Sequence, residues 1–331
     1  MSLETASRQA EADQLSTVVI QHASQLAGAT LGKSFELGGA RFRLHVKNRN
    51  TIYRVSGRSD WFLKLAPPAD SLVMQCERLG SDYCNRVLGR TDGYAGPFVS
   101  RVSLAPPFVL ADALNGPPLT RVLLVGAWAR RSPTQVEAAF ATLGTLLSVL
   151  HADRSLPSNA PEASKRPFDV VRQLAQKLRG KRHETIDAVR EWSEADRGGH
   201  EDDTFVHGNL RLDNLLLTET GIGFVDFENC GRGPRYQDAS RPITQLLLLR
   251  ASLAAPTASI DRILAAFMAS YRSAQPYDVA ALGEWVAVRL ARYYLESARR
   301  TRPGLIGGLP VVRPRLATLT RRLMRDGLEA V

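Results

Sequence analysis

The hydrophobic pattern in the first third of the chain predicts one helix followed by a small sheet. Apolar residues recur at helical spacing between Glu4 and Leu26, which predicts an amphipathic helix. From Phe42 to Leu65 apolar and polar residues alternate instead, with polar turns at 47–50 and 56–60, as in successive β-strands. The apolar stretch 98–110, which two adjacent prolines interrupt, suits the last strands of the same sheet.

After this sheet the pattern is mostly helical. An apolar-periodic helix is expected over 134–151, and the stretch 168–197 is expected to be polar and helical. Further helices are expected at 71–87, 239–250, 259–272, 278–300 and 313–328. The chain has 331 residues, which is enough for two modest lobes with a core each.

Composition indicates an ordinary globular protein. Apolar residues make up 44% and charged residues 23%, so a packed core rather than disorder is expected. No apolar run approaches the ~20 residues of a membrane span, and residues 1–14 lack the apolar core of a signal peptide. The three cysteines, Cys76, Cys84 and Cys230, have no metal-binding spacing, and a reducing cytoplasm is the expected location.

The positive charge of the chain is concentrated near its end. The net charge is +10, and the segment from Val286 to Arg325 carries ten arginines against one acid, Glu296. These arginines either form a solvated helical face or attract an anionic acceptor. No nucleic-acid recognition motif accompanies them, so nucleic acid is not an expected partner.

One stretch, Phe205 to Asp226, concentrates the chemistry. Two short apolar runs flank a turn at 218–221, which predicts a small hairpin. Asn214 precedes this hairpin and Asp226 follows it, so an amide oxygen and a carboxylate are expected side by side. Such a pair of hard oxygen ligands suits Mg²⁺.

The same stretch resembles the catalytic core of the aminoglycoside phosphotransferase and choline kinase family, which is related to the protein kinases. The family pattern is H-G-D-L-x-x-x-N, a short hairpin, then I-D-F or I-D-W. The matching residues here are His207, Gly208, Leu210, Asn214 and Val225-Asp226-Phe227.

The resemblance implies a bilobal protein-kinase-like fold of the α+β class. A small lobe with an antiparallel sheet would occupy residues 1–111, a hinge 112–118, and a larger, mainly helical lobe 119–331. The larger lobe would carry the catalytic loop and the acceptor site.

The resemblance also implies a nucleotide site in the small lobe. Lys64 lies between two leucines in an apolar strand, where a lysine needs a partner. In kinase-like folds such a lysine binds the α- and β-phosphates of ATP or GTP and pairs with a glutamate, here Glu77. Arg49 and Asn50, in the turn over the phosphates, are further candidates. The alternative is a strand-edge lysine in water with a solvated glutamate.

One position departs from the family pattern. Asn209 stands where the family has the Asp that accepts the proton of the acceptor hydroxyl. A neutral amide can orient a hydroxyl but cannot take its proton. His207 is expected to brace this loop, and Arg211 either neutralises the transferring phosphate or forms a surface salt bridge. Asp238 is expected to cap the helix that starts at Ala239.

The function implied by the resemblance is transfer of the γ-phosphate of ATP or GTP, with Mg²⁺, to a hydroxyl of a small molecule or peptide, impaired here by Asn209. One alternative is a kinase for Ser or Thr of a precursor peptide in natural-product biosynthesis. Another is a pseudokinase that binds nucleotide as a scaffold. The basic C-terminal region argues against a polycationic aminoglycoside and favours a neutral or anionic acceptor.

Overall fold

The computed structural model divides into two compact units. The first comprises Met1–Gly116 and Thr218–Cys230, and the second Pro117–Leu217 and Gly231–Val331. The described residues are 3–47, 50–129, 133–163, 167–177, 184–194, 203–252, 257–273, 276–299, 312–326 and 328. The segment Thr218–Cys230 lies far beyond the expected hinge in sequence, yet it packs with the first unit.

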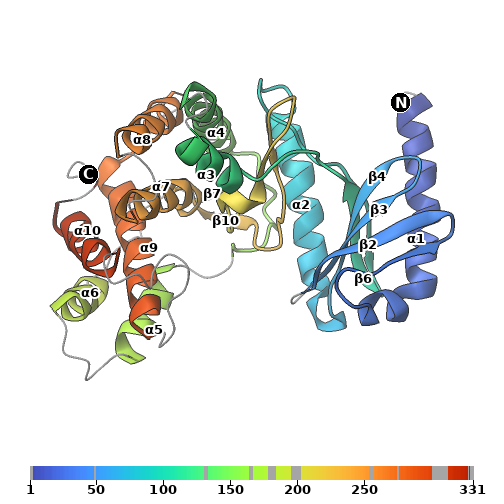
Figure 1. Ribbon diagram of the computed structural model, residues 1–331, viewed down its shortest axis with the longest axis horizontal. Coiled ribbons are helices and arrows are strands. Elements are labelled where there is room, and N and C mark those ends of the chain that lie inside the picture. The colour runs from blue at the N-terminus through green and yellow to red at the C-terminus, as the bar shows by residue number, and fades with distance from the viewer. Residues whose placement is uncertain are drawn as a thin grey trace. The chain divides into compact units, whose positions relative to one another are not determined.

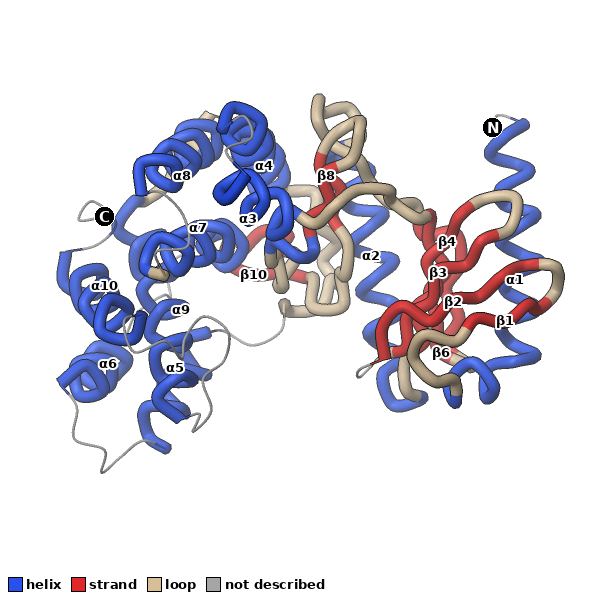
Figure 2. Tube along the Cα trace, in the orientation of Figure 1, coloured by secondary structure: helices blue, strands red, loops and turns tan. Residues whose placement is uncertain are grey.

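The first unit is built on a six-stranded sheet in which every neighbouring pair is antiparallel, as predicted (Figure 2). Its spatial order is β1-β2-β3-β4-β6-β5. The strands are β1 (Ser34–Leu37), β2 (Ala40–Lys47), β3 (Thr51–Ser56), β4 (Asp60–Leu65), β5 (Val99–Leu104) and β6 (Pro107–Asp112). Strand β4 pairs with β3 on one side and β6 on the other, and its residues Trp61 and 63–65 are buried.

Helices cover both faces of this sheet (Figure 1). Helix α1 (Leu3–Gly28) packs its apolar side chains against Trp61 and Leu63 of β4 and other strand residues, which together form the core of the unit. Because side chains alternate along a strand, Lys64 points away from this core. It points to the face covered by α2 (Ser71–Leu88), whose Glu77 it contacts.

The second unit is mainly helical, as predicted. The long helix α9 (Val279–Arg299) contacts α5 (Pro167–Lys177), α7 (Tyr236–Ala251) and α10 (Val312–Asp326), and α4 (Pro133–Ala152) runs along α8 (Thr257–Tyr271) (Figure 1). Asp278 caps α9 by accepting the N–H groups of Ala280 at 2.8 Å and Ala281 at 3.1 Å. Two short strands, β7 (Asp203–Val206) and β10 (Gly231–Pro234), pair in antiparallel fashion.

The stretch 168–197, expected to be polar and helical, contains two helices, α5 and then α6 (Glu184–Glu194), with 178–183 outside the described residues. Helix α3 (Leu119–Ala129) was not predicted. Within the described ranges, none of the helices has the length and apolarity needed to cross a bilayer.

A close contact fixes the segment Thr218–Cys230 to α2. A Cβ atom added at Gly80 of α2 would lie 2.5 Å from Cδ1 of Phe227, a residue that is buried. The glycine is therefore required by the space that Phe227 occupies and not by backbone conformation.

We expect Gly80→Ala to destabilise the protein by about 1–3 kcal/mol, because overpacking outweighs the better helix propensity of alanine. Denaturant unfolding measures the change. Gly28→Ala is the matched control, since nothing lies within 4 Å of a Cβ added at this last position of α1. Equal effects of the two substitutions would contradict the proposed contact.

Candidate active site

A buried ion-pair network in the first unit centres on Lys64. Its Nζ lies 2.5 Å from Oε1 of Glu77, 2.5 Å from Oδ1 of Asp226 and 3.2 Å from Oε2 of Glu228. Lys64 is 9% exposed and Glu77 6%. The structure thus brings Lys64 and Glu77 together and excludes the alternative of a lysine and a glutamate separately in water.

Backbone geometry holds the network in place. Oε2 of Glu77 accepts the N–H of Phe227 at 2.9 Å, so one carboxylate ties α2 to both β4 and the segment after β9 (Ile222–Phe224). Asp226 has φ of 70°, the one positive value among the described residues other than glycine. Asp tolerates this region better than most residues, and the turn directs its carboxylate to Lys64.

The charges of the network do not balance. Burial alone would lower the pKa of Lys64, but the carboxylates of Glu77, Asp226 and Glu228 outweigh it and the pKa is raised. Burial, followed by the charge of Asp226, raises the pKa of Glu77 against the opposing effect of Lys64. Because one ammonium faces three carboxylates, the network suits a further cation.

Two oxygen donors of the network could bind that cation. Mg²⁺ is usually held by one or two carboxylates together with phosphate oxygens and water. Asp226 and Glu228 could serve while Glu77 keeps Lys64 in position. Asn50, predicted to contact phosphate, donates from Nδ2 to Oε2 of Glu228 at 3.0 Å and so orients this carboxylate. Arg49, the other predicted phosphate contact, lies outside the described residues.

The sequence prediction missed Glu228. The signal was present, because Glu228 stands two positions after Asp226 in a polar turn. Its role became visible only when the fold placed it beside Lys64.

The predicted catalytic loop lies in the second unit and is held by its backbone. Directly after β7, the N–H of His207 donates to Oδ2 of Asp238 at 2.5 Å, and that of Gly208 to Oδ1 at 3.0 Å. The positive φ of 75° at Gly208 turns both amides to the same carboxylate. His207 is fully buried, and its expected bracing of the loop is made through this main-chain bond.

The expected role of Asp238 was wrong. Helix α7 starts at Tyr236, so Asp238 lies in its first turn and binds the catalytic loop instead of capping a helix at Ala239. Burial alone would raise the pKa of Asp238, but the hydrogen bond with His151 and the proximity of His207 outweigh it, and the pKa is lowered. Asp238 is therefore a buried anion that two loop amides stabilise.

The remaining predicted residues follow in the same loop. The main-chain oxygen of Asn209 accepts the N–H of Arg211 at 2.7 Å and Nδ2 of Asn214 at 2.9 Å. This bond fixes the Asn214 amide with its nitrogen toward the loop. Arg211 lies 3.0 Å from Asp213 and is half exposed. Asn214 ends a short 3₁₀ turn before β8 (Leu215–Leu217), and it belongs to the second unit whereas Asp226 belongs to the first.

Comparison with known proteins shows which family the chain matches. Residues 41–285 match the model of the phosphotransferase enzyme family. No curated protein sequence matches the chain significantly.

Three solved structures are similar to this chain. An amicoumacin kinase bound to AMP-PNP and Ca²⁺ has a TM-score of 0.56 at 14% identity, covering 86% of this chain and 87% of its own. A spectinomycin phosphotransferase in complex with ADP and spectinomycin has a TM-score of 0.55 at 11% identity, and the match covers 94% of this chain and 98% of its own. A choline/ethanolamine kinase family protein from Mesorhizobium loti has a TM-score of 0.53 at 15% identity, and the match covers 93% of this chain and 95% of its own. These likenesses confirm the predicted protein-kinase-like fold.

The anchoring of the loop by Asp238 gives a pH-dependent prediction. Asp238→Asn should cost about 1.5–3 kcal/mol of stability at pH 7, because an amide cannot accept both N–H groups as a carboxylate does. Since the pKa of Asp238 is lowered by folding, its contribution is complete above the unfolded value of about 3.9 and is lost as pH falls through the folded value. The difference from wild type should therefore shrink below about pH 4.

Denaturant unfolding across pH measures this difference. Asp261→Asn is the control, because Asp261 forms a partly exposed pair with Arg250 at 3.2 Å and should contribute less than about 1 kcal/mol. A gap between wild type and Asp238→Asn that stays constant from pH 7 to pH 3 would contradict the ionised state of Asp238.

Proposed function

The chain belongs to the phosphotransferase enzyme family, and on this premise we propose that it transfers the γ-phosphate of ATP or GTP to a hydroxyl group of a small molecule or peptide. The observation that carries the proposal is the network of Lys64 with Glu77, Asp226 and Glu228. A lysine held by a buried glutamate beside acidic metal ligands is the arrangement that phosphoryl transfer requires.

In the first unit, Lys64 would bind the α- and β-phosphates, and Glu77 would keep the ammonium in position. Asp226 and Glu228 would be too close to a polyphosphate for binding without a divalent cation, because like charges repel. We therefore propose Mg²⁺ as cofactor, with Asp226 and Glu228 of this unit as ligands. Asn214, the other ligand predicted from the resemblance, belongs to the second unit. The amicoumacin kinase with the same fold was solved with a nucleotide analogue and Ca²⁺.

In the second unit, the residue at position 209 would orient the acceptor hydroxyl. Its oxygen attacks the γ-phosphorus while the bond from that phosphorus to the β-phosphate oxygen breaks. Asn209 cannot take the proton that the hydroxyl loses, so the proton must pass to water or a phosphate oxygen. Loss of a general base typically costs ~10²–10⁴ in rate.

Asn209 favours a second candidate function, a pseudokinase that binds nucleotide as a scaffold without phosphoryl transfer. The two candidates agree on nucleotide binding and differ on chemistry. Cys76, Cys84 and Cys230 form no disulfide bond, which fits the proposed cytoplasmic location.

Nucleotide binding should depend on Mg²⁺. We expect calorimetry to detect micromolar binding of ATP or GTP with Mg²⁺ and much weaker binding in EDTA, because the carboxylate excess repels free nucleotide. Glu228→Gln should weaken Mg²⁺-nucleotide binding about tenfold, equivalent to ~1.4 kcal/mol. The control is Glu36→Gln. Glu36 forms an exposed ion pair with Arg41 in the same unit, and its substitution should leave the affinity for Mg²⁺-nucleotide unchanged. Absence of binding to either nucleotide would refute both candidate functions.

Restoring the carboxylate at position 209 distinguishes the candidates. Asn209→Asp should raise the rate of phosphoryl transfer by about 10²–10⁴. The rate is measured as the release of nucleoside diphosphate, with water or each of a panel of hydroxyl compounds as the acceptor. The control is Gln25→Glu, which also replaces an amide with a carboxylate, at an exposed position of α1. It should leave the rate of phosphoryl transfer unchanged. If Asn209→Asp binds nucleotide normally but transfers no phosphate, the scaffold function stands and the transferase proposal fails.

A further inference from the structure

Four arginines of the second unit gather beside the catalytic loop. They are Arg211 in the loop, Arg241 on α7, and Arg289 and Arg292 on α9. Arg289 and Arg292 belong to the arginine-rich segment that the sequence suggested could be a solvated face. Arg289 is in fact 5% exposed, so this part of the segment faces inward.

Arg241 lies on the side of α7 that carries the catalytic loop. Asp238, three positions earlier, accepts the N–H groups of His207 and Gly208. Gln245, four positions later, accepts the N–H of Leu212 through Oε1 at 2.9 Å. Residues spaced by three and four positions share one face of a helix. Arg241 therefore stands between the two points at which α7 holds the loop that presents Asn209.

Helix α9 brings its arginines to the same turn of α7. Nε of Arg289 donates to Oγ of Ser240 at 2.7 Å, and Nη2 of Arg289 donates to the main-chain oxygen of Gln237. Arg292 and Tyr293 follow at positions i+3 and i+4 and share the face of Arg289. Tyr293 is 38% exposed, so this face reaches the surface. Arg289 joins the helices, and Arg292 and Tyr293 continue outward from it.

Among the residues that the structure describes, the cluster has one more cation than anions. Arg211 pairs with Asp213 at 3.0 Å and Arg292 with Glu296 at 2.8 Å, and the third nearby carboxylate is that of Asp238. Burial lowers the pKa of Arg241, and Arg292 and Arg211 lower it further. Burial also lowers the pKa of Arg289 strongly, and Arg241 adds to this effect. Four guanidinium groups thus share three carboxylates.

Arg241 carries the unmatched charge. Its Nε is buried and has no hydrogen-bond acceptor within the part of the chain that the structure describes. A buried guanidinium nitrogen that lacks an acceptor destabilises the folded state, and an anion from outside would remove the cost. The excess positive charge suits an anion, and the planar guanidinium fork fits a carboxylate with two parallel hydrogen bonds.

We propose that Arg241, with Arg292 and Tyr293, binds a carboxylate of the acceptor and so holds a hydroxyl of the same molecule at Asn209. This inference rests on the proposed function and narrows its acceptor to a hydroxy acid. A polycationic acceptor would be repelled from the same place.

The test uses the full chain without nucleotide and compares L-malate with L-malamide by calorimetry. The two probes differ only in charge, so an arginine site should bind malate with saturation and malamide at least about tenfold more weakly. Arg241→Gln should weaken malate binding about tenfold or more while Mg²⁺-ATP affinity stays within about twofold. Arg292→Gln provides a second variant should Arg241→Gln fail to fold.

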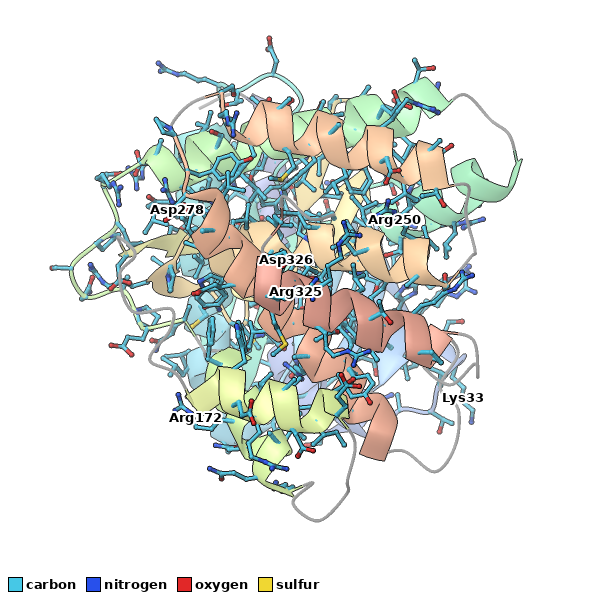
Figure 3. The ribbon with its side chains drawn as sticks, turned by 90° about the vertical axis from the view of Figure 1, so that its left-hand side faces the viewer. Lys33, Arg172, Arg250, Asp278, Arg325 and Asp326 are labelled. Carbon is cyan, nitrogen blue, oxygen red and sulfur yellow. The ribbon has the colours of Figure 1, made fainter. Side chains whose placement is uncertain are left out.

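The matched control is Arg325→Gln. Arg325 is exposed on α10 and pairs with its neighbour Asp326 at 2.7 Å (Figure 3). It should leave the binding of malate and of nucleotide unchanged.

Each other outcome overturns the inference. Equal binding of malate and malamide, or no binding of either, would show that no carboxylate site exists. Tighter binding of inorganic phosphate than of malate would assign the cluster to a phosphorylated ligand. A loss of ATP affinity in Arg241→Gln with malate binding intact would assign it to the nucleotide. Normal nucleotide binding without malate binding would refute this inference alone and leave the proposed function standing.

Discussion

The buried ammonium of Lys64 is the constraint on which the polar interior of the first unit depends. A charge inside a sheet must be paired, and here three carboxylates from α2 and the segment after β9 converge on it. Removing one partner of a buried ion pair typically costs about 3–5 kcal/mol. The strand, the helix and the distant segment are therefore held together by the charge that the proposed chemistry uses. Stability and the candidate function share the same residues.

The second unit also contains a buried charged side chain, but here the charge is negative. Asp238 is a buried anion, and it is satisfied by backbone amides of the catalytic loop and by the neighbourhood of His151 and His207. Arginines gather around the same helix without a full set of acids, so one face of α7 carries both the buried anion Asp238 and Arg241, whose Nε lacks an acceptor among the described residues.

The sequence predicted most of the fold because its patterns are local. Period-two alternation located the sheet, helical spacing located α1, α2 and α4, and an apolar strand around Lys64 signalled a buried charge. Long-range contacts were not accessible in this way. Asp238 meets His207 across 31 positions, and Glu228 meets Lys64 across 164, and no spacing rule links such residues. Arg289 was counted with surface arginines because composition does not reveal which helix face packs inward.

The main-chain oxygen of Asn209 helps to anchor the catalytic loop. It accepts hydrogen bonds from Arg211 and Asn214, and any amino acid at this position would supply the same oxygen. An exchange between carboxylate and amide there changes one proton acceptor and leaves the hydrogen bonds from Arg211 and Asn214 intact. The two proposed functions, scaffold and enzyme, are therefore separated by one amino-acid exchange that keeps these two hydrogen bonds, so that either could evolve from the other in a single step.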